Sequence, residues 1–166
     1  SYSGLATAKL LQKRFGTPYV VGLPVGESFS KEWIWSIEKA AKTGESLVCC
    51  TRRESALKPE IAIIGESVSA GSLAAAIAES TGKEARVLCP LETEKGLLAE
   101  NDRQTPDEDD MIPVLSSAGT IIADPMFQPI CPKNARFIPL AHEAFSGRIY
   151  RKNIPDLIGR GLNNFL

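Results

Sequence analysis

The stretch from Pro59 to Leu73 constrains the fold of this chain more than any other. Residues 61–64 (Ile-Ala-Ile-Ile) form a continuous apolar run, which is typical of a parallel strand covered on both faces. Gly65 ends this run, and an Ala-rich helix begins shortly after it. A second apolar strand is predicted at residues 85–89. Strand, helix and strand within about 30 residues predict one βαβ unit with a right-handed crossover.

Further strands and helices alternate on both sides of this unit. Short apolar runs bounded by Gly or Pro predict strands at residues 19–23, 120–123 and 136–140. Periodic apolar positions predict helices at residues 4–15, from Ser28 or Ser30 to Gly44, from Thr105 to Gly119, and after Asn153. The alternation predicts an α/β fold: a three-layer αβα sandwich with a small, mostly parallel, Rossmann-like sheet of the chelatase-like type.

The buried face of three helices can be predicted as well. The expected inward positions are Ile34, Ile37 and Ala41; Met111, Ile112 and Leu115; and Leu157, Ile158 and Leu162. Thr105 and Glu108 are spaced as the two ends of a capping box, with a proline between them at the first helical position. Pro113 is expected to kink or shorten the helix that follows.

The length of 166 residues predicts one domain with an additional arm. Residues 47–50 either extend the preceding helix or form a connector, and the charged residues 51–58 mark an internal boundary. We therefore expect residues 1–58 to be a lead-in helix, strand and helix that pack on or complete the domain. Residues 59–166 are expected to form the α/β domain itself.

Composition and charge exclude several classes of protein. The net charge of −1 does not favour nucleic acid as a partner, and no run of about 18 apolar residues predicts a membrane span. The four cysteines, at positions 49, 50, 89 and 131, form no CxxC pair, so we expect reduced thiols in a cytoplasmic protein. No signal peptide is recognisable, and the absence of a starting methionine leads us to expect a piece of a longer protein.

Open parallel sheets bind ligands outside the carboxyl ends of their strands. The turn from Gly65 to Gly71 could hold an anion on backbone N–H groups, but it is neither a GxGxxG motif nor a P-loop, and Glu66 would repel phosphate. An ordinary strand-to-helix turn is the alternative interpretation. His142 is the only histidine, and it could bind a metal, carry a proton or simply lie in a surface loop. The residues predicted to line a ligand-binding cleft are Gly65, Glu66, Ser67, Ser69, His142, Glu143 and Ser146.

The order of several short motifs resembles the C-terminal part of nitrogenase component 1-type proteins. The motifs are Phe15-Gly16-Thr17-Pro18, Leu23-Pro24-Val25-Gly26, the strand from Ile61 to Glu66, Ile121-Ile122-Ala123-Asp124-Pro125, and Arg136 to Leu140 followed by Ser146-Gly147-Arg148. Each motif is short, but together they span nearly the whole chain.

This resemblance implies a subunit built of three similar α/β domains, of which the chain represents about one. The parent would pass electrons from an ATP-dependent iron–sulfur reductase through a metal cluster to a substrate. Its partners would be the other domains of the subunit, a related subunit and the ATP-dependent iron protein. Because the cysteines of the family's bridging cluster lie in an N-terminal domain, the resemblance implies no cofactor and no metal ligand in this chain. The fragment alone would be inactive, and its apolar contact surface could form a homodimer.

A binding module is the alternative to an oxidoreductase fragment. An α/β domain of the chelatase-like or substrate-binding type would hold a metal complex or a tetrapyrrole without redox catalysis. A plain interaction domain is a third interpretation.

Overall fold

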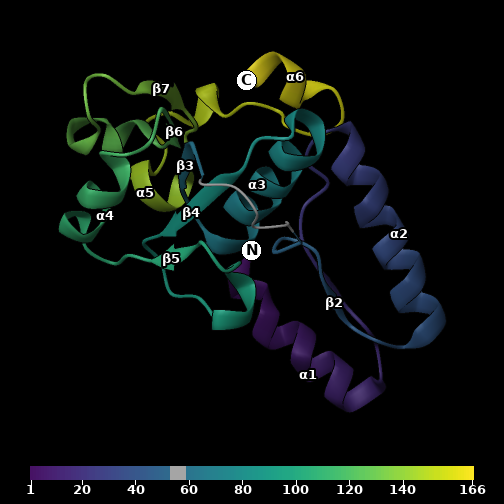
Figure 1. Ribbon diagram of the computed structural model, residues 1–166. Helices are drawn as coiled ribbons and strands as arrows, with labels where there is room; N and C mark the ends of the chain where they lie inside the picture. Colours follow the sequence, from purple (N-terminus) through teal and green to yellow (C-terminus); the bar gives the residue numbers. More distant parts are fainter. Residues whose placement is uncertain (53–58) are drawn as a thin grey trace.

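The computed structural model describes residues 1–52 and 59–166. Its centre is a five-stranded sheet with the order β5-β4-β3-β6-β7, in which every neighbouring pair is parallel (Figure 1). These strands are β3 (Ile61–Ile64), β4 (Ala85–Cys89), β5 (Arg103–Gln104), β6 (Thr120–Ala123) and β7 (Arg136–Pro139). A separate parallel pair joins β1 (Val20–Val21) to β2 (Leu47–Val48). The predicted α/β fold with a small parallel sheet is confirmed.

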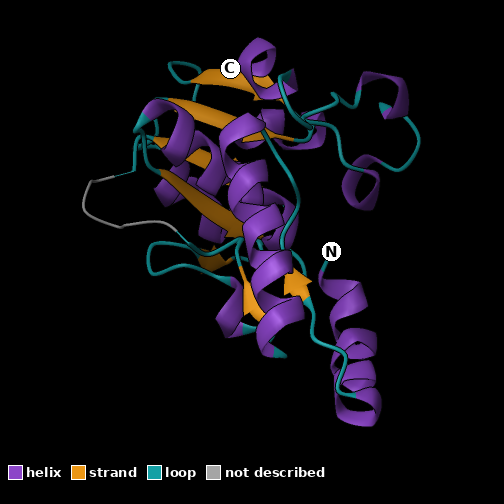
Figure 2. Cartoon of the chain, turned by 90° about the vertical axis from the view of Figure 1, so that its right-hand side faces the viewer, coloured by secondary structure: helices purple, strands orange, loops and turns teal. Residues whose placement is uncertain are grey.

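Helices cover both faces of the five-stranded sheet (Figure 2). The α-helices are α1 (Leu5–Phe15), α2 (Glu27–Thr43), α3 (Ser67–Thr81), α4 (Glu108–Leu115), α5 (Glu143–Ser146) and α6 (Gly161–Phe165). Short 3₁₀ helices are η1 (Tyr2–Gly4), η2 (Lys95–Leu97), η3 (Pro125–Ile130) and η4 (Arg151–Asn153). The helix α1 extends away from the sheet, and α2 lies outside α3 (Figure 1).

Two apolar layers sandwich the sheet, because alternate residues of a strand point to opposite faces. On one face, Ile61 and Ile63 belong to a buried cluster with residues of α3 and with Phe29 of α2. On the other face, Ala62 and Ile64 belong to a cluster with residues of α4 and η3. The continuous apolar run of β3 thus reflects burial on both sides, and the three-layer arrangement follows from it.

The strand order places a topological switch point beside β3. The chain runs from β3 outward to β4 and β5, and then returns across the sheet to β6 and β7. The strands β4 and β6 pair with β3 on opposite sides. In open sheets, ligands bind at the carboxyl edge next to such a reversal.

The N-terminal residues pack into the same core. Val25, Phe29 and Cys49 belong to the apolar cluster that includes β3 and α3. Contact is also close at the backbone, since a Cβ atom added at Gly71 of α3 would lie 2.7 Å from the carbonyl oxygen of Cys50. The predicted boundary at residues 51–58 falls mostly outside the described residues, and the division into two parts stays a prediction.

The predicted core face of α2 is wrong. Ile34 and Ile37 are exposed, whereas Phe29, Ser36 and Ala40 are buried. The helix carries two apolar stripes, and the one that contains small residues faces α3. The predicted capping residues Ser28 and Ser30 lie inside the helix, which begins after Gly26. Periodicity alone does not show which stripe a neighbouring helix will cover.

Three other local predictions need correction. Residues 47–50 do not extend α2, because Leu47–Val48 form the strand β2. Thr105 is not a helix cap: its N–H donates to the carbonyl of Cys89 and continues the β5 pairing, so α4 begins only at Glu108. Met111 and Leu115 are buried as predicted, but Ile112 is exposed.

The last helix is also shorter and later than predicted. Residues 151–153 form η4, and the final helix α6 begins only at Gly161. Leu162 is buried as expected, but Ile158 is exposed. Pro155 and the positive φ of Gly159 interrupt helical geometry between these two elements.

The shared core predicts that Phe29 contributes to the stability of the whole fold. Phe29→Ala should lower the free energy of unfolding by about 3–5 kcal/mol, because the side chain is fully buried and its loss leaves a cavity. The measurement is urea denaturation followed by circular dichroism. Phe15→Ala is the matched control, since Phe15 is 72% exposed and should change stability by less than about 0.5 kcal/mol. Equal effects of the two substitutions would contradict packing of α2 on the core.

Candidate functional site

A cleft of about 230 Å³ opens at the carboxyl end of β3. Three parts of the chain form its walls: residues 23–25 after β1, the end of β3 with the first turns of α3, and two stretches after β7, at residues 140–142 and 154–158. The lining is almost entirely apolar, with Leu73, Leu140 and Leu157 among its side chains. The cleft therefore lies at the switch point that the strand order defines.

Backbone pairing fixes the outer wall of the cleft. The N–H of Gly26 donates to the carbonyl of Leu157 at 2.8 Å, and Val25 and Gly26 form bridges with Ile158. Gly26 has φ of 65°, and a Cβ atom there would lie 2.8 Å from the side chain of Leu162. Glycine is required at this position for both reasons. The residues after β1 are thereby attached to the segment that leads into α6.

Glu66 caps α3 with its side chain. The carboxylate accepts hydrogen bonds from the N–H groups of Val68 at 3.2 Å, Ser69 at 3.0 Å and Tyr2 at 2.8 Å. Burial by itself would raise the pKa of Glu66, but these three backbone donors lower it, and the net shift is downward. The carboxylate thus neutralises the helix N-terminus and ties η1 to the sheet.

Asp124 has the same role one strand away, and sequence reasoning missed it as a site residue. Its fully buried carboxylate accepts from the N–H groups of Met126 and His142 and from the hydroxyl of Ser146, at 2.7–2.9 Å. The signal was present in the sequence, because Asp directly before Pro at the end of a strand is a typical side-chain cap. Asp124 links the ends of β6 and β7 to α5.

His142 lies on the wall of the cleft and begins α5. Its Nδ1 atom accepts a hydrogen bond from the N–H of Ala144 at 3.1 Å. The ring also packs against Phe145, with 5.3 Å between ring centroids. The backbone is held by Asp124 and the ring by Ala144, so the position of the imidazole is fixed at two points.

Three of the predicted cleft residues line the cleft: Gly65, Ser69 and His142. The other four take part in contacts around it. Glu66 caps α3, and the hydroxyl of Ser67 accepts a hydrogen bond from that of Thr93 at 2.7 Å. Glu143 pairs with Arg151 at 2.9 Å, and Ser146 donates to Asp124. The expectation that Gly65 and His142 share one rim is confirmed.

The four cysteines are distributed over three separate apolar clusters. Cys49 and Cys89 are buried in the cluster on the α3 side of the sheet, and Cys131 packs on the opposite side. Burial raises the pKa of the Cys89 and Cys131 thiols, which disfavours the thiolate that metals require. Among residues 1–52 and 59–166, no three His, Cys, Asp or Glu side chains are grouped as metal ligands.

The lowered pKa of Glu66 predicts how its contribution to stability depends on pH. A carboxylate with a depressed pKa stabilises the fold above the pKa of an unfolded glutamate, and this stabilisation is lost as the pH falls through the folded pKa. Glu66→Gln should therefore destabilise the protein at pH 7, and the difference from the native chain should shrink as the pH falls below the pKa of an unfolded glutamate and through the lower folded pKa. Urea unfolding at several pH values measures this. Glu45→Gln, at an exposed position, should show no such trend, and a pH-independent effect of Glu66→Gln would contradict the assignment.

Comparison of the chain with protein-family models, with curated proteins and with solved structures finds no match. In the part of the chain that the structure describes, no helix has both the length and the apolar character needed to cross a bilayer. The inference of function therefore rests on the residues of the cleft.

Proposed function

We propose that this chain is a ligand-binding α/β domain whose cleft holds the apolar part of a small organic molecule. The observation that carries this proposal is the cleft itself, which combines an apolar lining with the switch-point position where α/β sheets bind ligands. Burial of the ligand's apolar surface against residues such as Leu73 and Leu140 would supply the driving force. His142 and Ser69 are the polar side chains on the wall.

The volume of the cleft limits what it can enclose. Typical small-molecule pockets measure about 300–1,000 Å³. At about 230 Å³, this cleft fits a compact molecule or one edge of a larger one. A tetrapyrrole or a bulky metal complex would enter only in part, and a second protein surface would have to cover the remainder.

The helix N-terminus beside the cleft favours an uncharged ligand over a phosphate. Anions bind at helix N-termini through free backbone N–H groups. At α3, the N–H groups of Val68 and Ser69 already donate to the Glu66 carboxylate. A phosphate would have to displace that carboxylate and then lie next to its charge. We therefore infer that the cleft is not a nucleotide site.

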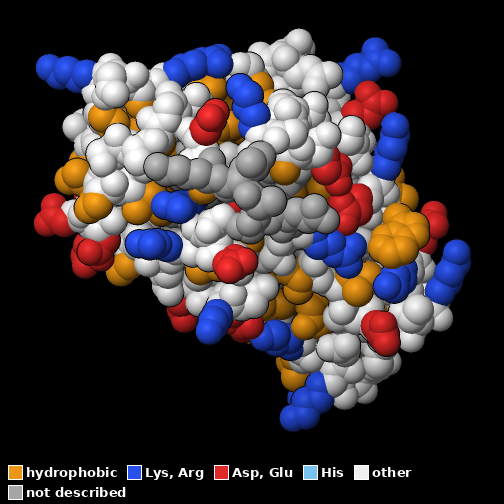
Figure 3. Space-filling model, in the orientation of Figure 1, with side chains coloured by type: hydrophobic (Ala, Val, Ile, Leu, Met, Phe, Trp, Pro, Cys, Tyr) orange, Lys and Arg blue, Asp and Glu red, His pale blue; other side chains and the backbone are white. Residues whose placement is uncertain are grey.

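A second candidate is that this domain belongs to a nitrogenase-like oxidoreductase and supplies one wall of its substrate cleft. Exposed apolar side chains on α1 and α2 favour it, because a domain of a larger subunit needs contact surface. They include Leu10, Leu11 and Phe15 on α1 and Ile34, Trp35 and Ile37 on α2. Figure 3 shows hydrophobic side chains at the surface on the side where α2 lies. In this proposal the redox centre and the ATP-dependent iron protein belong to other parts of the complex.

Placing a charge on the cleft wall should abolish binding of an apolar ligand. Ile154 lines the cleft and is 44% exposed, so Ile154→Asp should fold normally. The probe is N-phenyl-1-naphthylamine, an uncharged dye that fluoresces in apolar surroundings. We expect saturable binding to the native chain and at least about 10-fold weaker binding to Ile154→Asp, because the ligand would desolvate the carboxylate.

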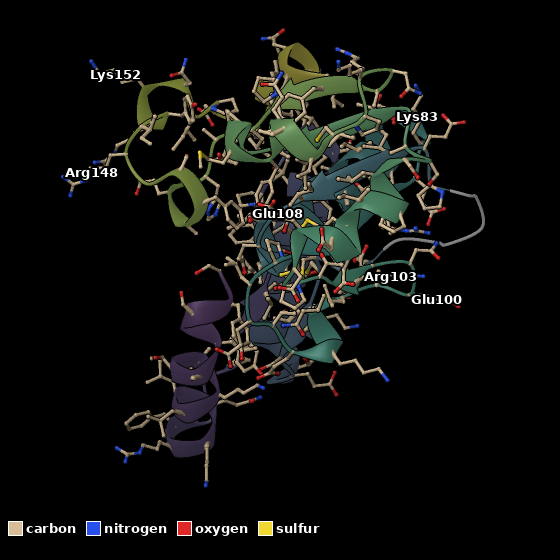
Figure 4. All side chains as sticks on the ribbon, turned by 90° about the vertical axis from the view of Figure 1, so that its left-hand side faces the viewer. Lys83, Glu100, Arg103, Glu108, Arg148 and Lys152 are labelled. Atoms are coloured by element: carbon tan, nitrogen blue, oxygen red, sulfur yellow. The ribbon has the colours of Figure 1, made fainter. Side chains whose placement is uncertain are left out.

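Ile149→Asp is the matched control. Ile149 lies in the same segment, is 73% exposed and is not part of the cleft wall. Its neighbours Arg148 and Lys152 extend away from the sheet in Figure 4. Binding by this variant should stay within about twofold of the native value, since surface substitutions have small effects. Equal loss in both variants, or unsaturable binding by the native chain, would contradict a ligand site at the cleft.

The arrangement of the cysteines predicts that this chain does not assemble an iron–sulfur cluster alone. Anaerobic incubation with iron and sulfide, followed by desalting, should leave no stoichiometric iron and no cluster absorption, because an iron–sulfur cluster needs about four convergent thiolates. The control is a variant in which all four cysteines are replaced by serine, and it should give the same spectrum. A cluster that the native chain holds and this variant lacks would overturn the prediction.

A further inference from the structure

The hydrogen-bond pattern of His142 determines which nitrogen of its neutral imidazole carries the proton. Nδ1 accepts the N–H of Ala144, so Nδ1 carries no proton in this arrangement. In a neutral imidazole the proton then lies on Nε2. Nδ1 and Nε2 flank the Cε1 atom of the ring, so Nε2 is separate from the position that Ala144 occupies, and His142 lines the cleft. Within residues 1–52 and 59–166, Nε2 has no hydrogen-bond partner.

Three other polar groups at the cleft already donate their hydrogens to atoms of the protein. The hydroxyl of Ser69 donates to the carbonyl of Glu66 at 3.2 Å, which leaves only its oxygen lone pairs. The N–H of Gly65 donates to the carbonyl of Leu88 at 3.1 Å. The N–H of His142 itself donates to Asp124. The Nε2–H group of His142 is consequently the side-chain donor that the described cleft wall can offer to a ligand.

We propose that the cleft selects ligands that carry a hydrogen-bond acceptor, such as a ketone or amide carbonyl, on an apolar body, and that the Nε2–H of His142 donates to it. This inference rests on the proposed ligand-binding function and adds the class of ligand. Because Nε2 is protonated in this tautomer, the imidazole acts as a donor and not as a metal ligand at that atom. Before any ligand binds, Asp124 holds the backbone of His142 and Ala144 holds its ring. This lowers the entropic cost of the hydrogen bond to the ligand.

Two compounds of nearly equal size can test the donor. 2-Acetylnaphthalene carries a carbonyl where 2-ethylnaphthalene has a methylene group. The native chain should bind the acetyl compound about 3- to 10-fold more tightly, the range expected for one net hydrogen bond. His142→Ser should keep the cap of α5, because Ser is a good capping residue, but its short side chain does not reach the position of the Nε2–H donor. In this variant the two compounds should bind with about equal affinity.

The possible results distinguish failure of the proposed hydrogen bond from failure of the proposed ligand site. Equal binding of the two compounds by the native chain, or a preference that His142→Ser retains, would contradict donation by His142 while leaving the proposed ligand site intact. Failure of the native chain to bind either compound would overturn the proposed function and this inference together. Nitrogen-15 NMR of the histidine side chain at pH 8 gives a readout that does not need a ligand: the Nε2–H tautomer is expected, and the Nδ1–H tautomer would overturn the inference.

Discussion

Two buried carboxylates organise the carboxyl edge of the sheet. Glu66 follows β3 and Asp124 follows β6, the strand that pairs directly with it. Glu66 accepts four hydrogen bonds and Asp124 accepts three, all from N–H or O–H donors, and the bonds of each reach both its own next helix and a segment distant in sequence. Hydrogen bonds to a charged group contribute about 1.5–3 kcal/mol each, which offsets the cost of burying a carboxylate. Loss of either carboxylate would leave buried donors without partners.

The hydrogen bonds of these two carboxylates explain why the wall of the cleft is mostly apolar. The strand ends and the N-terminus of α3 carry donors that could otherwise bind an anion. Because Glu66 and Asp124 occupy donors at this edge, the cleft beside them has an apolar wall whose polar side chains are those of Ser69 and His142. If the cleft binds a ligand as proposed, the hydrogen bonds that stabilise the edge also disfavour an anionic one.

The parts of the fold that were predictable from sequence are those with a single strong local signal. The apolar run Ile61–Ile64 predicts a doubly covered parallel strand, and the rule that parallel strands end at one edge brings Gly65 and His142 together. The elements that were mispredicted each had two plausible local states. The helix α2 has two apolar stripes, and Thr105 suits a helix cap but pairs with Cys89. Tertiary contacts decide such cases, and no local pattern encodes them.

At the cleft too, local sequence patterns do not give the tertiary contacts, as Asp124 and the segment before α6 show. The Asp-Pro pair after β6 indicates a cap, but its bonds to His142 and Ser146 depend on where β7 ends in space. Residues 154–158 look like the first turns of an amphipathic helix. Instead, they line the cleft, where Ile158 forms bridges with Val25 and Gly26. Hydrophobic periodicity gives the apolar stripe of a helix but not whether a neighbour buries it.

The residues that form the cleft also indicate whether the chain can be divided into two separate parts. Its walls come from residues 23–25, from β3 and α3, and from residues 140–142 and 154–158, so they lie on both sides of the predicted boundary near residue 58. The bond between Gly26 and Leu157 crosses that boundary, as does the contact between Tyr2 and Glu66. A chain cut at this boundary would expose the apolar faces of Val25 and Phe29 and would lose one wall of the cleft. The lead-in residues therefore form the cleft as much as the sheet does, and a ligand that binds there as proposed would couple binding to the folding of both parts.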